Sequence, residues 1–227
     1  MAQTGAGAFR AALEDELSWR RDEIRNLRNL GPQQGAKPHL HESHRRALIV
    51  MLYAHLEGFV RFSFEQYAVA INSAKVSIKD AKPQLCAACL DDRFKSYRSS
   101  DASDPYDPHG NRARQVMKDA ALIAEVLDMQ LRHIKLPIDI VSSVESNLSP
   151  VVFRRSLALL ALDDTEFHKF VNALEGLLKL RNNIAHGKLL NLPSDPAFRK
   201  VEARIFDLCE TLMRAVYESV RDEAYRR

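Results

Sequence analysis

The chain of 227 residues is 46% hydrophobic and 28% charged, an ordinary globular balance that can bury a hydrophobic core. The net charge of +3 permits nucleic-acid binding but does not argue for it, because a dedicated binder is usually more basic. Three cysteines do not make a disulfide framework, and the amino terminus lacks the pattern of a secretory signal. We therefore expect a cytoplasmic protein that does not associate with a membrane, its longest nearly uncharged apolar stretch (47–56) being about half a membrane span.

Alanine, leucine, arginine and glutamate dominate the composition and favour helix nearly everywhere. In chain order, hydrophobic periodicity predicts helices over residues 9–30, 42–72, 79–94, 113–133, 149–160, 165–186 and 195–224. The first of these belongs to an N-terminal segment, 1–35, and the last to a C-terminal segment, 196–227. We expect one all-α domain over residues 1–227, a bundle of about five to seven helices.

Local signals mark several helix boundaries and one long loop. Ser149 is a good N-cap before a proline, Asp164 is expected to cap the helix that follows, and Gly187 stands where a left-handed helix terminator belongs. Residues 95–112 are rich in serine, aspartate, proline and glycine, so we expect a long polar loop there. Such loops in compact domains are usually functional or mobile.

The predicted helix 42–72 carries a carboxylate in an apolar setting. Its centre, residues 47–54, is apolar nearly all the way round, which is typical of a helix buried on most sides. Glu57 falls at helical spacing among apolar residues, and a buried carboxylate needs a partner, for which Arg181 is the first candidate. His55 is interpreted as a satisfied core or interface histidine.

A polar cluster, Leu180–Gly187, ends the amphipathic helix 165–186. The apolar face of that helix runs through Phe167, Phe170, Val171, Leu174, Leu177 and Leu178. Three positions after Leu178, Arg181 continues this face of the helix. Asn182 and His186 are four positions apart and lie on an adjacent face. Arg181 and His186 lie roughly 140° apart around the helix axis, so a twofold dimer would bring such groups together better than one chain does.

These residues resemble the HEPN superfamily, and more narrowly a bacterial branch found among toxin–antitoxin and phage-defence loci. The resemblance rests on three stretches, 55–59, 146–148 and 180–187. The superfamily motif is an arginine, a following polar residue, and a histidine after four to six intervening positions. Arg181, Asn182 and His186 meet it with four residues between arginine and histidine.

The resemblance implies a metal-independent endoribonuclease without a cofactor, acting on RNA as a homodimer and restrained by an antitoxin or another regulatory protein. His186 would move protons, and Arg181 would hold the scissile phosphate. Asn182 would orient the phosphate or the imidazole. Supporting residues would be Glu57, Asn183 and Asn147. Two alternatives stay open: a non-catalytic HEPN-fold module that binds RNA or protein, and a helical scaffold whose polar cluster only sets dimer register.

Two further motifs each allow a structural and a functional interpretation. Cys86 and Cys89 are too few ligands for a zinc site, and we interpret them as structural thiols. Basic and aromatic residues alternate at Arg93, Lys95, Tyr97 and Arg98, a mixture that could contact RNA. A solvated loop edge is the alternative for this second motif.

Overall fold

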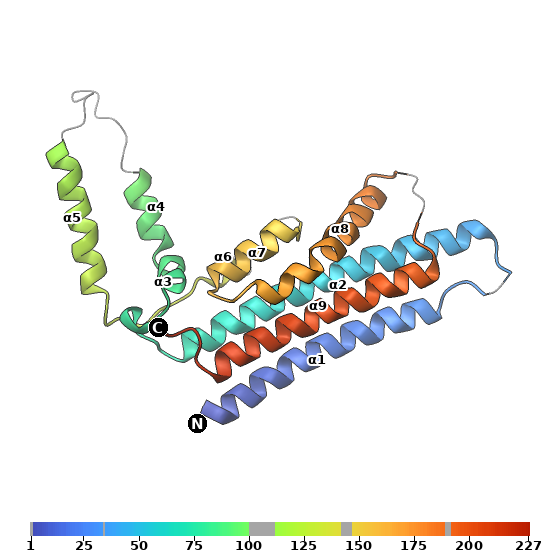
Figure 1. Ribbon diagram of the computed structural model, residues 1–227, viewed down its shortest axis with the longest axis horizontal. Coiled ribbons are helices and arrows are strands. Elements are labelled where there is room, and N and C mark those ends of the chain that lie inside the picture. The colour runs from blue at the N-terminus through green and yellow to red at the C-terminus, as the bar shows by residue number, and fades with distance from the viewer. Residues whose placement is uncertain (1, 34, 100–111, 142–146, 189–191) are drawn as a thin grey trace.

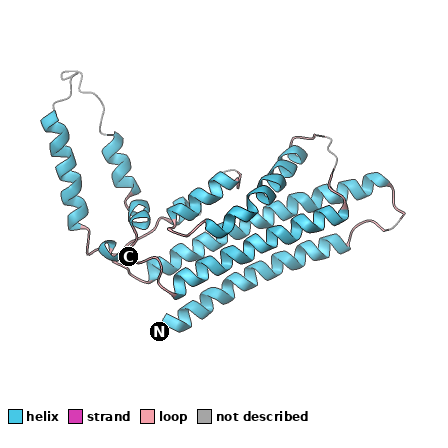
Figure 2. Ribbon diagram, in the orientation of Figure 1, coloured by secondary structure: helices cyan, strands magenta, loops and turns pink. Residues whose placement is uncertain are grey.

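The computed structural model describes residues 2–33, 35–99, 112–141, 147–188 and 192–227, and nearly all regular structure in it is helical (Figures 1 and 2). Within these residues there is no β-strand, only two isolated bridges, Ser77–His133 and Ala81–Arg226. The all-α prediction is therefore confirmed.

Three long helices lie side by side and form the main bundle (Figure 1): α1 (Ala2–Asn29), α2 (Pro38–Ser73) and α9 (Asp195–Arg221). Each of the three contacts the other two. Apolar side chains at helical spacing supply the shared core, since one stripe of each helix faces its neighbours. On α1 and α9 the buried members include Leu13, Leu17, Ile24, Ile205, Leu208, Leu212 and Val216.

Helix α2 is the centre of the fold. It starts at Pro38, earlier than the predicted Glu42, because proline suits the first helical turn. Four of its aromatic side chains are buried, Tyr53, Phe59, Phe64 and Tyr67, and the helix contacts α1, α8 and α9. Ala47, Val50 and Ala54 stay exposed. Of the described helices only α2 is long and apolar enough to cross a membrane, and 56% of its most apolar window is buried. A central bundle helix has the same properties.

The His55–Gly58 stretch of α2 receives polar side chains from α1. A Cβ atom on Gly58 would lie 2.9 Å from Nη2 of Arg20, whose buried guanidinium pairs with Glu16 at 2.7 Å. His55 is buried, as interpreted from the sequence, with its Nε2 2.9 Å from a carboxylate oxygen of Glu23. This part of the motif therefore docks α1 onto α2.

The region after α2 differs from the sequence prediction. The predicted helix 79–94 is in fact a 3-10 turn (Ile78–Asp80), α3 (Pro83–Cys89) and the start of α4 (Asp91–Ser99). Pro83 starts a new helix because it has no N–H to continue the preceding turn. Residues 95–99 of the predicted loop are helical, and residues 100–111 lie outside the described residues.

Helix α5 (Arg112–Asp128) is joined to α4 by side-chain bonds such as Arg93–Glu125, and the two form an arm that extends away from the bundle (Figure 1). It ends before the predicted His133 because the next residues bond to the segment before α3: the Ile78 N–H donates to the Arg132 carbonyl at 2.9 Å. The chain then passes through the short α6 (Ile138–Val141) towards the bundle.

Helices α7 (Pro150–Leu159) and α8 (Val171–Ala185) lead to α9. Ser149 caps α7 as predicted, since its Oγ accepts the Val152 N–H at 3.2 Å. The prediction for Asp164 is wrong: it pairs with Arg154 at 2.7 Å, and Asp163 accepts the Thr165 N–H instead. Residues 165–170 form a 3-10 helix before α8, and α9 ends at Arg221 rather than continuing to 224 or 227.

Candidate active site

Arg181 lies in the last turns of α8, on the side that faces α2. Its guanidinium carbon is 4.7 Å from the centre of the Tyr53 ring. Its Nη1 donates to the side-chain oxygens of Asn147 and Asn182, each at 2.8 Å. Ring and amides together fix the direction of the guanidinium fork, because a planar group with two bonds and a stacked face has little freedom left.

Tyr53 connects this arginine to the segment before α7. Its hydroxyl accepts the Leu148 N–H at 2.7 Å, and both residues are buried. Burial raises the pKa of Tyr53, the Leu148 bond and the charge of Arg181 lower it, and the charge of Glu57 raises it. From the sequence, Tyr53 was predicted only as part of the apolar centre of its helix, residues 47–54. One feature of the sequence could have identified Tyr53 as a site residue: its helix was predicted to lie near Arg181, and an arginine stacks readily on an aromatic ring.

The arrangement leaves hydrogen-bond donors for a ligand. A guanidinium has five N–H donors and no acceptor. In Arg181 only the donors of Nη1 are bonded to the two amides. Because arginine cannot accept, the amide oxygens of Asn147 and Asn182 must face it, and their NH2 groups point elsewhere. The guanidinium donors that these bonds leave unused are those of Nε and Nη2, and guanidinium N–H groups suit an anion such as phosphate.

His186 occupies the C-cap of α8, and a Schellman motif fixes its backbone. The Gly187 N–H donates to the Ile184 carbonyl and the Lys188 N–H to the Asn183 carbonyl, both at 3.0 Å. Gly187 has φ +67°, the left-handed conformation predicted for it. The imidazole is exposed, and nothing among the described residues is bonded to it. One chain thus presents Arg181 and His186 at the same helix end without joining them.

The remaining predicted supporting residues fall into different places. Glu57 does not pair with Arg181; it lies 3.7 Å from Arg61, one turn along α2, because Arg181 is held by the two amides. Asn147 is brought to the site, as the sequence allowed, while Ser146 lies outside the described residues. Asn183 is half-buried and contributes its backbone carbonyl to the end of α8.

The four predicted RNA-contact residues lie on α4, in the arm and away from the end of α8 (Figure 1). The sequence predicted a loop for Lys95, Tyr97 and Arg98, but all three are helical. Arg93 pairs with Glu125 of α5 at 3.0 Å, Lys95 and Arg98 pair with Asp91 at 2.6 and 3.9 Å, and Tyr97 bonds to Asp119. The contacts of Arg93 and Tyr97 join α4 to α5, whereas those of Lys95 and Arg98 with Asp91 lie within α4.

The two neighbouring cysteines make protein contacts. The Cys86 thiol donates to the Ile78 carbonyl at 3.2 Å, and the Cys89 sulfur accepts the Lys135 N–H at 3.4 Å. Burial raises the pKa of Cys86. In the part of the chain that the structure describes, no three histidine, cysteine, aspartate or glutamate side chains gather as a metal site would require.

Comparison with known proteins gives one match. The family described as HEPN_MAE_28990-like HEPN matches residues 9–225. No curated protein and no solved structure matches the chain. The matched range includes every residue of the Arg181 cluster and His186.

Proposed function

This chain belongs to the HEPN_MAE_28990-like HEPN family, and on that premise we propose that it is a metal-independent endoribonuclease of toxin–antitoxin or phage-defence type. The observation that carries the proposal is the Arg181 cluster. A guanidinium oriented by Tyr53, Asn147 and Asn182 stands one to two turns from an exposed imidazole, and the backbone just after that imidazole is fixed by the left-handed turn at Gly187.

The proposed reaction is an internal transesterification of RNA. His186 takes the proton from a ribose 2′-hydroxyl, and the 2′-oxygen attacks the adjacent phosphorus. The P–O5′ bond breaks, the 5′-oxygen receives a proton from an imidazolium, and the products carry a 2′,3′-cyclic phosphate and a 5′-hydroxyl. Arg181 stabilises charge on the phosphoryl oxygens. DNA has no 2′-hydroxyl and would not be cleaved.

A homodimer is part of this proposal. Positions 181 and 186 are roughly 140° apart around α8, and Arg181 turns towards Tyr53 while His186 is exposed. A twofold axis beside the end of α8 would set the histidine of one subunit against the arginine of the other. A partner protein that covers this cleft would then act as the antitoxin or regulator.

One observation favours a second candidate, a HEPN-fold module that binds RNA or protein without cleavage. The contacts of Arg181 with Tyr53, Asn147 and Asn182 are those that a structural arginine would also make. In that case the cluster would hold α8 on α2, and His186 would be an ordinary helix-end residue.

The deciding experiment is cleavage of total cellular RNA by the purified protein in EDTA. Wild type is compared with His186→Ala, Arg181→Ala and the matched control His168→Ala, which removes another exposed imidazole. We expect fragments with cyclic phosphates from wild type and the control only, with all four proteins folded and of equal oligomeric state. Cleavage that survives His186→Ala would refute the mechanism.

Intact RNA with a folded, dimeric wild type would favour the binding module. The toxin or defence role is tested separately, by induced expression in bacteria. Wild type is expected to arrest growth and His186→Ala to permit it.

A further inference from the structure

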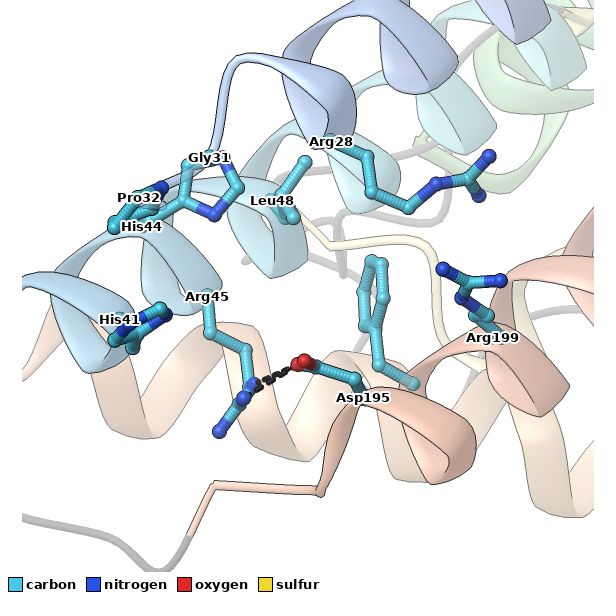
Figure 3. A pocket seen from close by; sticks show the side chains of 10 residues that line it. Arg28, Gly31, Pro32, His41, His44, Arg45, Leu48, Asp195 and Arg199 are labelled. Atoms are coloured by element: carbon cyan, nitrogen blue, oxygen red, sulfur yellow. Dashed lines mark hydrogen bonds and ion pairs between the residues drawn. The ribbon is translucent and has the colours of Figure 1, made fainter. Parts of the chain in front are cut away.

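A pocket of about 330 Å³ lies where the end of α1 meets the starts of α2 and α9 (Figure 3). None of its lining residues belongs to the Arg181 cluster. On α2 the nearest lining residue to that cluster, Leu48, precedes Tyr53 by five positions, roughly 7 Å along the helix axis. The ionisable residues that line it are Arg28, His41, His44, Arg45, Asp195 and Arg199.

Most of these groups are basic. Three guanidinium and two imidazole groups line the pocket, against the carboxylate of Asp195. Arg199 is exposed and turns towards Arg28 in Figure 3, and the described part of the chain offers its guanidinium no bonded partner. Arg28 is paired with Glu202, so Arg199 is the arginine of the lining that lacks a carboxylate partner among the described residues, and an anion beside it would supply the missing charge.

Neighbouring contacts hold the lining in place. His44 Nε2 donates to the Leu27 carbonyl at 2.9 Å and so occupies a free acceptor at the end of α1. A Cβ atom on Gly31 would lie 2.7 Å from Cε1 of this imidazole, so the glycine admits the ring. Glu202 accepts two bonds of 2.7 Å from Nη1 of Arg28, which leaves Nε and Nη2 of that arginine for another ligand.

Asp195 is the group that a ligand would displace. Its Oδ1 accepts bonds from Nε of Arg45 at 3.1 Å and from Nη2 of the same arginine, and its side chain is 74% exposed against 20% for Arg45. A phosphate can replace both contacts, and the exposed carboxylate returns to water at little cost when it is released. Asp195 also starts α9, a helix of 27 residues whose N-cap Ser194 makes no side-chain cap bond. Free N–H groups there favour an anion further.

The geometry points to a second anion site: the pocket between α1, α2 and α9 binds a phosphate group through Arg45 and Arg199, with Arg28 beside them. Phosphate is the anion that fits best, since it carries more charge than a carboxylate and accepts paired N–H bonds from several guanidinium groups at once. The phosphate belongs either to an RNA strand or to a free nucleotide. This site does not require that His186 cleave RNA.

The test is calorimetric titration of the full chain at low ionic strength with three probes: inorganic phosphate, AMP, and a short single-stranded RNA without terminal phosphates. The His186→Ala background keeps the RNA intact. Arg199→Gln and Arg45→Gln remove the proposed ligands. Lys200→Gln is the matched control, because it removes the same charge from the next, exposed residue of α9, outside the pocket lining.

We expect Arg199→Gln to weaken probe binding about tenfold or more, as loss of one charge-assisted hydrogen bond does, and Lys200→Gln to change it less than about twofold. Asp195→Asn should strengthen binding. Tight binding of AMP identifies a nucleotide site. Binding of RNA alone, with a salt slope lower by about 0.7 in Arg199→Gln, identifies a strand contact.

Equal affinities of Arg199→Gln and Lys200→Gln, or no binding of any probe by the folded chain, would overturn the proposal. Loss of the Arg199-dependent binding in Arg181→Ala would also overturn it, because the phosphate would then lie at the Arg181 cluster. All of these binding outcomes can be interpreted even if the wild type does not cleave RNA.

Discussion

Replacing Tyr53 by phenylalanine separates one hydrogen bond from everything else that the ring does. The Phe variant keeps the apolar volume in the core and keeps a face for Arg181 to stack on. It loses only the hydroxyl that accepts the Leu148 N–H at 2.7 Å. Since Leu148 is fully buried, the donor is left without water or another partner.

The magnitude follows from that unpaired donor. A buried, unsatisfied N–H costs about 1–3 kcal/mol, and a chain of this length loses about 2–4 °C in Tm per kcal/mol. We therefore expect Tyr53→Phe to lower the Tm by about 4–8 °C at a cost near 2 kcal/mol. The Asn147–Leu148 segment also loses its anchor to α2, so Arg181 is held less well and RNA cleavage should fall.

Tyr67→Phe is the matched control on the same helix. Tyr67 is buried as well, and its hydroxyl bonds to Ser219 Oγ at 2.6 Å, away from the site. Both variants are measured by thermal unfolding and by RNA cleavage at a temperature where both are folded. Equal activity of the two variants, or an unchanged Tm in Tyr53→Phe, would refute the argument that Tyr53 positions Arg181 through Leu148.

Three further outcomes test the fold. Gly58→Ala should change the free energy of unfolding in urea by less than about 1 kcal/mol, because the new Cβ meets only the flexible end of Arg20, 2.9 Å away, and alanine favours the helix; a larger loss would contradict this. Burial lowers the pKa of His55 despite Glu23, so the unfolded chain binds the proton better and stability should fall as pH drops below about 6.5. His55→Gln should flatten that slope, and equal slopes would count against it. Burial raises the pKa of Cys209 to about 12, so its thiol should react with a disulfide reagent only after unfolding; rapid reaction of native Cys209 would contradict this.

The helices of the bundle were predictable because their periodicity reports burial directly. Apolar residues of α9 recur every three or four positions, and this face, with Ile205, Leu208, Leu212 and Val216, is the one that is buried. Between α2 and α5 the same reasoning failed, since Pro83 starts a new helix inside a continuous pattern. There the contacts of Ile78 with Arg132, 54 positions later, decide where the helices end, and no local window contains both.

At the site, local chemistry was readable and long-range pairing was not. Gly187 predicted its own left-handed turn, because the signal and the structure occupy the same few residues. The partner of Arg181 depends on which side chain the fold brings next to it, and helical spacing alone does not show this. Sequence spacing suggested Glu57, but a segment just before α7 inserts Asn147, and Glu57 turns to Arg61.

Because α9 follows the Arg181 cluster in the chain, the bundle can be completed only after that cluster has been synthesised. The Arg181 cluster and His186 emerge before α9, yet α9 packs on both α1 and α2 and completes the core on which α8 rests. At about 5–20 residues per second, the 36 residues from the end of α8 to Arg221 take roughly 2–7 s to translate. A ribosome that stalls in this interval releases or holds a chain with its motif complete and its bundle open. If the chain is the ribonuclease proposed above, this order of helices would delay RNA cleavage until α9 has been made.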